Sequence, residues 1–257
     1  MRIALGIEYD GTAYNGWQRQ NNGLGIQQRL EEALSAVADH AVDVTCAGRT
    51  DTGVHATGQV VHFDTTSVRE NRDWLLGANS KLPGDISVMW AQNVDDDFHA
   101  RFSATGRNYR YCILNRPERS AIHRHRAWWV FKPLDAVRMH EAAQLLFGEH
   151  DFSAFRAAGC GANTPRRNVT RLSVRRDGDW IMLEVSANAF LQHMVRNITG
   201  ALAAIGGGER PVRWISDVLN SRDRKKGGVA APPHGLTLVS VDYPTAAGMP
   251  QQPTGCR

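Results

Sequence analysis

Long apolar stretches are missing from this sequence. Although 42% of the 257 residues are hydrophobic, no uninterrupted apolar run approaches the roughly 18 to 20 residues that cross a bilayer. This excludes a protein built on membrane-spanning helices. The first nine residues alternate apolar and polar side chains and include Glu8, whereas a signal peptide needs a basic start and a continuous apolar stretch. We therefore expect a cytoplasmic protein.

Cysteine is scarce, and the four present are far apart in the chain: Cys46, Cys112, Cys160 and Cys256. They form no CxxC pair that could seed a zinc site, and a chain of this length rarely depends on a disulfide framework, so we expect reduced thiols. His123 and His125 could face one way on a strand and bind a metal. No cysteine or carboxylate lies beside them, however, so a basic surface strip is the preferred interpretation and no metal is expected.

Nucleotide-binding motifs are also missing. Gly11–Gly16 resembles a phosphate-binding loop, but Trp17 and Gln18 stand where such a loop needs lysine and serine or threonine. Gly23 and Gly25 lack the third glycine of a dinucleotide-binding turn. The sequence therefore predicts that the protein uses no cofactor.

Lysine is rare, since only four of the 30 basic residues are lysines and the rest are arginines. The net charge of +4 also hides a division, because residues 1–100 carry 7 basic and 14 acidic residues, whereas residues 101–257 carry 23 and 12. Arginine is suited to bidentate contacts with phosphate. Two clusters, 101–126 with seven arginines and 156–176 with six, favour a polyanionic partner over a merely solvated basic surface.

Hydrophobic periodicity predicts the same order of elements twice. A half-buried strand with Ile3, Leu5, Ile7 and Tyr9 on one side opens the chain. The pattern then predicts helices at 25–39, 69–80, 134–147, 190–205 and 211–220, and strands at 42–46, 59–64, 86–94, 107–114, 169–175, 180–187 and 236–241.

This order predicts an α+β protein with two ferredoxin-like domains, similar in plan to RRM modules. Each domain would have an antiparallel sheet with helices on one face. We expect the first domain at residues 1–104, the second at 105–244 and a disordered tail at 245–257, which is rich in proline, glycine and glutamine.

The most unusual local sequence is Gly48–Ala56 (GRTDTGVHA), which lies in the connection between two predicted strands. Two glycines bracket Arg49 and Asp51. One interpretation is a tight turn in which Asp51 bonds to backbone amides. The other is a rigid loop that presents a carboxylate together with a guanidinium.

This segment resembles the signature of the tRNA pseudouridine synthase A family. Five further segments agree with the family in order, from Tyr9 to Leu236: Tyr9–Gln18, Phe98–Ala104, Tyr109–Tyr111, Asn188–Arg196 and Ala231–Leu236. The resemblance covers almost the whole chain and departs from the family only at 116–133 and in the tail.

The resemblance implies an isomerase that converts uridine to pseudouridine in the anticodon stem-loop of tRNA, at family positions 38–40, in a cleft between the two domains. Asp51 would be the nucleophile, and Arg196 would be its partner cation. A carboxylate nucleophile must be ionised at pH 7, and a neighbouring cation favours the ionised form. The target base must be flipped out of its helix, with Arg49 holding the vacated space. Tyr109 would stack on the uracil and help remove its C5 proton, and Leu236 would line the base pocket.

The resemblance also implies a homodimer that binds tRNA across both subunits, a partner that the arginine clusters suit. On sequence alone, Tyr109 and Leu236 have an alternative interpretation as ordinary core residues. The alternative for Arg196 is a cation on the surface of a helix. The main alternative function is a non-catalytic RNA-binding module of similar sheet architecture, although no stretch carries the glycine-aromatic pattern of such modules. A glycoside hydrolase would need paired acids across a sugar site and an acidic cleft.

Overall fold

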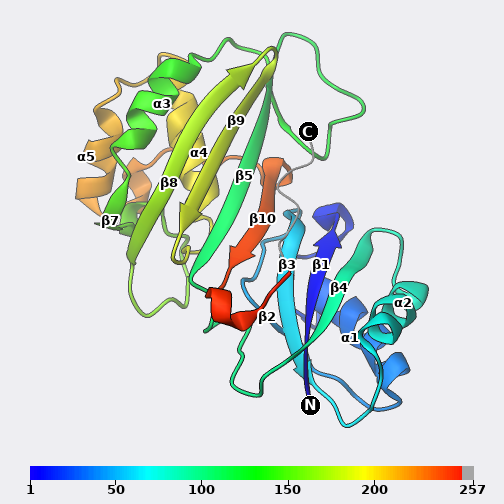
Figure 1. The fold of residues 1–257 in the computed structure, drawn as a ribbon. Coiled ribbons are helices and arrows are strands. Elements are labelled where there is room, and N and C mark those ends of the chain that lie inside the picture. Colours follow the sequence, from blue (N-terminus) through cyan, green and yellow to red (C-terminus); the bar gives the residue numbers. More distant parts are fainter. Residues whose placement is uncertain (251–257) are drawn as a thin grey trace. The chain divides into compact units, whose positions relative to one another are not determined.

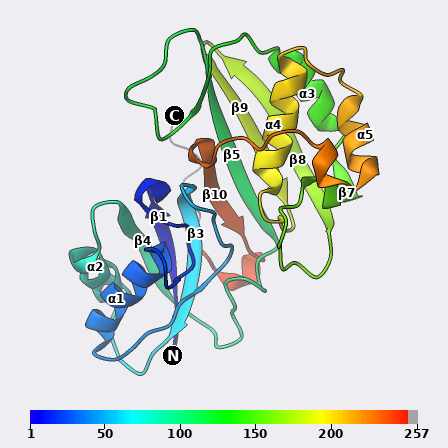
Figure 2. The same cartoon turned by 180° about the vertical axis from the view of Figure 1, so that it is seen from behind.

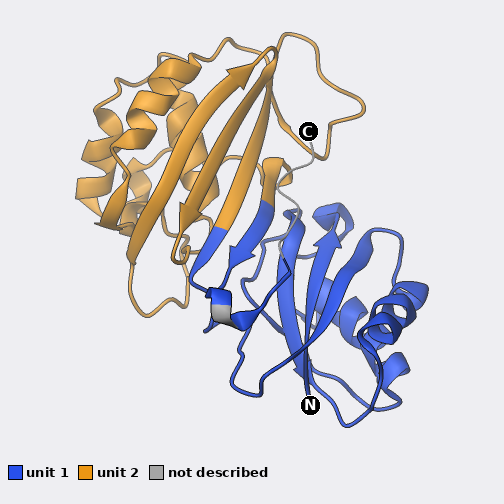
Figure 3. Cartoon of the chain, in the orientation of Figure 1, with its two compact units in different colours: residues 1–107, 238–257 blue, residues 108–237 orange. Residues whose placement is uncertain are grey.

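The computed structural model describes residues 1–250, which form two compact units (Figure 3). Unit 1 contains residues 1–107 together with the C-terminal segment from residue 238, and unit 2 contains residues 108–237. Both units combine a sheet with helices, so the α+β prediction is confirmed.

The sheet of unit 1 has the strand order β4-β1-β3-β10. These strands are β1 (Arg2–Tyr9), β3 (His55–Asp64), β4 (Ile86–Val94) and β10 (Leu236–Asp242), and the two-residue β2 (Thr45–Cys46) pairs with β3. Strand β1 is antiparallel to both β3 and β4. Helices α1 (Ile26–Ala38) and α2 (Asn71–Lys81) lie together on one face of this sheet, as Figures 1 and 2 show from opposite sides.

Strand β1 is buried on both faces, whereas the sequence predicted a half-buried strand. Ile3, Leu5 and Ile7 are fully buried as expected, but Ala4 is fully buried as well. On the face with Ala4, a Cβ on Gly6 would lie 2.0 Å from the indole nitrogen of Trp90, so this ring lies directly on the β1 backbone. A central strand between two partners can be covered on its second face by one large side chain from a neighbour.

The C-terminal segment groups with unit 1, although the sequence placed residues up to 244 in the second domain. The Thr57 hydroxyl donates to the carbonyl of Val239, and the Tyr243 hydroxyl donates to that of Ala100. Hydrogen bonds of this kind join residues far apart in the chain, which periodicity cannot reveal. Within the predicted tail, Thr245–Ala247 form a short 3-10 helix, and residues 251–257 lie outside the described part of the chain.

The sheet of unit 2 has the strand order β5-β9-β8-β7. These strands are β5 (Gly106–Asn115), β7 (Gly148–Asp151), β8 (Arg166–Asp177) and β9 (Trp180–Ala187). The three helices α3 (Ala136–Gln144), α4 (Met194–Gly206) and α5 (Trp214–Ser221) cover one face of this sheet (Figures 1 and 2). Alternation along β9 turns Ile181, Leu183 and Val185 into the core and leaves the residues between them on the other face.

Unit 2 contains two short strands, at 128–130 and 148–151, that the sequence did not predict, and its helices begin and end at other residues than predicted. The short β6 (Trp128–Val130) pairs with β5 in parallel, so the unit is not purely antiparallel. Helix α4 begins at Met194 and not at residue 190, because His193 takes a left-handed conformation with φ of 61° immediately before the first helical residue. The apolar residues Phe190 and Leu191 extend the helical pattern in the sequence without belonging to the helix.

Candidate active site

The loop Ala47–Val54 connects β2 to β3 and carries both Arg49 and Asp51. Asp51 is half-buried and Arg49 is exposed. The amide of Val54 donates to the carbonyl of Asp51 at 3.1 Å, and Gly53 has a φ of 75°, a conformation that favours glycine. The loop is therefore a tight turn that also presents a carboxylate, and the two interpretations of the sequence are compatible.

The sheet beneath the loop fixes its first half by buried polar contacts. A hydrogen bond of 2.8 Å joins the Tyr9 hydroxyl to the Thr50 hydroxyl. The Gln59 side-chain amide donates to the carbonyl of Gly48 at 2.6 Å, and the Arg107 guanidinium donates to the carbonyl of Ala47 at 2.9 Å. These contacts restrain the backbone on the N-terminal side of Asp51.

Two glycines in the segment after β1 allow its backbone to lie directly on the loop. A Cβ on Gly11 would lie 2.0 Å from the carbonyl oxygen of Val54, and a Cβ on Gly16 would lie 2.7 Å from that of Thr50. The next residue, Trp17, donates its amide to the Thr50 carbonyl at 3.0 Å. The glycines that resemble a phosphate-binding loop in the sequence therefore serve close backbone packing.

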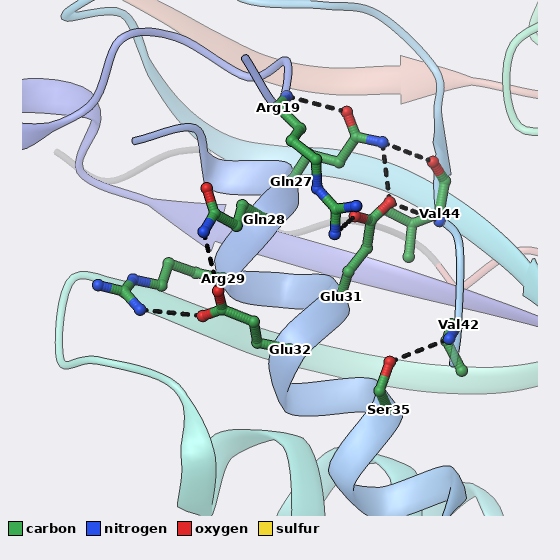
Figure 4. A network of polar contacts seen from close by, with 9 residues as sticks. All are labelled: Arg19, Gln27, Gln28, Arg29, Glu31, Glu32, Ser35, Val42 and Val44. Carbon is green, nitrogen blue, oxygen red and sulfur yellow. Dashed lines mark hydrogen bonds and ion pairs between the residues drawn. The ribbon is translucent and has the colours of Figure 1, made fainter. Parts of the chain in front are cut away.

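A buried carboxylate connects the residues that precede the loop with the segment that packs on the loop (Figure 4). Glu31 of α1 is 2% exposed, and its Oε1 accepts from the amide of Val44 at 3.1 Å and from the side chain of Gln27 at 2.8 Å. Its Oε2 lies 2.5 Å from Arg19 in an ion pair that lacks hydrogen-bond geometry. Gln27 in turn donates its backbone amide to the carbonyl of Trp17. Val44 leads into β2, so the network fixes the entry to the loop and the segment packed on it.

Unit 2 carries the other three predicted site residues. Tyr109 lies on β5, is half-buried and meets the ring of Phe190 edge-on at 5.0 Å between centroids. Leu236 is the first residue of β10 and is 5% exposed. Gly235 before it packs on Tyr111, since a Cβ there would lie 2.7 Å from the tyrosine ring.

Arg196 lies in the first turn of α4 and is held by the segment that leads to Leu236. Its Nε donates to the carbonyl of Ala231 at 2.9 Å, and the Ala231 amide donates to the Arg196 carbonyl at 3.0 Å. The Tyr111 hydroxyl donates to the carbonyl of Pro232 at 2.7 Å, and burial raises the pKa of this tyrosine, which keeps it a donor. The structure thus brings Arg196 and the Ala231–Leu236 segment together within unit 2, while Asp51 and Arg49 belong to unit 1.

The chain is similar to known proteins over most of its length. A family profile described as tRNA pseudouridine synthase matches residues 6–103 and 142–244. The chain is 57% identical to tRNA pseudouridine synthase A of Aeromonas hydrophila over 255 residues, which cover 99% of this chain and 95% of the relative. It is 55% identical to the protein of the same name from Pseudoalteromonas atlantica and 54% identical to that of Coxiella burnetii, each over 99% of this chain and 97% of the relative. The chain belongs to the tRNA pseudouridine synthase A family.

In this family member, several residues that support the loop are not apparent from the sequence. Gln59 lies between two buried residues of β3, whereas the neighbours of Arg107 on β5 are half-buried. A polar residue at a strand position is therefore the only signal that the two share. Glu31 and Glu32 are adjacent charged residues of α1, and the sequence does not reveal that only Glu31 is buried.

The two arginine clusters of this synthase-family chain divide into exposed and structural residues. Arg110 and Arg171 both reach Glu184 at 2.9 Å on the sheet face away from the helices. Arg167 is only 8% exposed and donates to the carbonyls of Thr164 and Arg166. It is therefore a structural residue of the 164–167 turn, whereas the Arg171 side chain is 65% exposed beside its partner Glu184.

Two features are absent from the part of the chain up to residue 250. It contains no group of three His, Cys, Asp or Glu side chains placed to hold a metal ion. None of its helices is long and apolar enough to cross a membrane.

Proposed function

We propose that this chain isomerises uridine to pseudouridine in tRNA. The observation that carries the proposal is the restrained Ala47–Val54 loop with Asp51 at its turn, in a chain 57% identical to a named tRNA pseudouridine synthase A. The finer proposal, from the resemblance of the motifs, is that the targets lie in the anticodon stem-loop.

The reaction breaks the N1–C1′ bond of uridine, turns the uracil and joins its C5 to C1′, with loss of the C5 proton to solvent and gain of a proton at N1. Nothing else is added or removed, so the chemistry requires no redox partner and no group donor. Asp51 is the proposed nucleophile, and a rigid turn suits this role because a nucleophile must be positioned before the reaction begins.

The remaining site residues have proposed roles in holding the substrate. Arg49 is exposed beside Asp51 and would occupy the space of the flipped nucleotide. Tyr109 would stack on the uracil and assist removal of the C5 proton, and Leu236 would line the base pocket. Arg196 would be the cation that pairs with Asp51, and its Nε bond to Ala231 supports the role because it fixes the guanidinium.

The proposal includes the assembly and the location of the enzyme. We expect a homodimer, as in the family, and a cytoplasmic protein, because its substrate is tRNA. Light scattering coupled to size exclusion measures the first, and a monomer that is fully active would contradict it.

The deciding experiment replaces Asp51 by Asn, which removes the nucleophile and hardly changes the side-chain volume. Chemical mapping of pseudouridine in tRNA treated with purified protein should show nucleotide-specific modification by the wild type and none by D51N, with tRNA affinity within a few fold. Asp43→Asn is the matched control, because Asp43 is exposed and two residues before β2. Turnover by D51N near the wild-type rate would exclude Asp51 as the nucleophile, and tRNA binding without any pseudouridine in the wild type would favour the non-catalytic RNA-binding alternative.

A further inference from the structure

A hollow lies in unit 2, mostly in the stretch of chain between the two segments that the family profile matches. The loop that follows β5 returns as the parallel strand β6 and borders a half-open hollow of about 310 Å³. Leu114 and Ala127 are its buried lining residues, and Trp128 closes it beside Tyr111, at 6.4 Å between ring centroids.

The exposed lining of this hollow is basic and aromatic. It includes Arg119, His123, Arg124 and Trp129, and among the described residues no aspartate or glutamate lines the hollow. Within the described residues the Arg119 side chain makes no hydrogen bond or ion pair, so its guanidinium is available to a ligand. A phosphate group is the ligand that suits such an arginine.

The aromatic wall is held in place before any ligand arrives. The indole of Trp129 is 40% exposed and donates its Nε1 hydrogen to the carbonyl of Arg116 at 2.9 Å. The loop itself is closed by the amides of Arg126 and Ala127, which donate to the carbonyl of His123. A fixed, partly exposed indole offers a stacking surface for a nucleobase at little cost in side-chain entropy.

Two residues that line the hollow lie close in the sequence to the proposed base-binding residues. His234 lines it and stands two residues before Leu236. Leu114 lies on β5, the strand that carries Tyr109. Because Leu114 follows Tyr109 by five residues, a nucleotide bound here would lie about 16 Å along β5 from this tyrosine.

We propose that this hollow binds an unpaired nucleotide of the tRNA, separate from the target uridine, with its base on Trp129 and its phosphate on Arg119. The proposal rests on the proposed function, because it assumes that tRNA is the substrate. A single arginine-phosphate contact contributes about one unit to the salt slope of binding, and one stacked base contributes a sequence-tolerant gain in affinity.

The test measures the dissociation constant of the full chain for a substrate tRNA transcript over a series of salt concentrations. Arg119→Ala should weaken binding by roughly three- to tenfold and lower the log-log salt slope by about one. Trp129→Ala should weaken binding by roughly tenfold with an unchanged slope, and Trp129→Phe should recover most of the loss. Arg213→Ala is the matched control: it removes the same charge from an exposed arginine of unit 2 at the start of α5, and it should change affinity less than twofold.

The outcomes separate this proposal from the function on which it rests. If Arg119→Ala and Trp129→Ala bind tRNA like Arg213→Ala, the hollow does not bind tRNA and the proposal is overturned. If uridine monophosphate displaces tRNA from the wild type at comparable concentration but not from Trp129→Ala, the hollow is a mononucleotide site and the tRNA assignment is wrong. If the wild type forms no pseudouridine while both variants bind tRNA more weakly than the control, the proposed activity fails and the nucleotide site stands.

Discussion

The backbone amide of Trp17 donates to the carbonyl oxygen of Thr50 at 3.0 Å, one residue before Asp51. This contact joins two segments that lie more than thirty residues apart in the chain, and it requires that Gly16, with a φ of 90°, lie against the same carbonyl. The position of the proposed nucleophile therefore depends on Gly16, which has no side chain and belongs to the segment after β1.

Gly16→Ala should damage the site through its Cβ, which would lie 2.7 Å from the Thr50 carbonyl oxygen in a left-handed backbone conformation. We expect a loss of about 2 kcal/mol or more in the free energy of unfolding, and a lower turnover in folded protein. Urea unfolding and single-turnover assays measure the two effects. Gly84→Ala is the control, because a Cβ on Gly84 meets nothing within 4 Å and its φ is ordinary. Equal stability of the two variants would show that the close packing at Gly16 is dispensable.

Glu31→Gln should destabilise the protein, whereas Glu32→Gln should not. Both acids accept from a glutamine one turn earlier and lie near an arginine, but only Glu31 is buried and bonded to the amide of Val44 (Figure 4). The new amide group would face Arg19 without a charge to pair with it. We expect a loss of about 1 to 3 kcal/mol for E31Q and less than about 0.5 kcal/mol for E32Q, measured by urea unfolding. Similar losses in both variants would contradict the role given to burial.

Arg196→Ala should reduce the single-turnover rate much more than the affinity for tRNA. The proposed partner of Asp51 would be lost, and removal of one partner of a desolvated pair commonly costs about 3 to 5 kcal/mol. Arg196→Lys should restore only part of the rate, because lysine has no counterpart of the Nε hydrogen that bonds to Ala231. The assay uses saturating enzyme so that weak binding cannot mimic slow chemistry. A normal rate in R196A would identify Arg196 as a structural residue of the 231–236 segment.

The stability of unit 1 should fall in mild acid through His62. Burial, followed by the nearby Arg2, lowers the pKa of this histidine from 6.5 to about 4, and its Nδ1 accepts from the amide of Ala100. Between these two pH values the unfolded chain binds a proton that the folded chain does not, so the stabilisation is complete above pH 6.5 and is lost as the pH falls toward 4. The shift corresponds to at most about 3 kcal/mol.

His62→Asn should flatten this pH dependence, since asparagine keeps an acceptor near the Nδ1 position and does not titrate. The measurement is the difference in the free energy of unfolding between pH 7 and pH 4.5, for wild type and variant. An identical difference in both proteins would assign the acid sensitivity to other groups.

Much of the site could be predicted from the sequence because its residues occur in short, contiguous motifs. Gly48–Ala56 is unusual on its own, and the turn it predicts is present with Gly53 in the left-handed conformation. The supporting residues could not be found in this way, because Gln59 and Arg107 act through loop carbonyls that only the folded chain brings near them. The catalytic roles of Asp51, Arg49, Tyr109, Arg196 and Leu236 stay predictions, which the substitutions above test.

Periodicity alone determined the α+β class and most elements, since the apolar stripe of α1 and the alternation of β9 are properties of consecutive residues. Only the tertiary structure decided which elements share a sheet, because hydrogen bonds between strands do not depend on distance along the chain. It therefore placed the segment after residue 238 in unit 1. It also decided which charged side chains are buried: Arg167 and Glu31 look like surface residues in the sequence, but the backbone carbonyls and amides around them offset the cost of burying their charge.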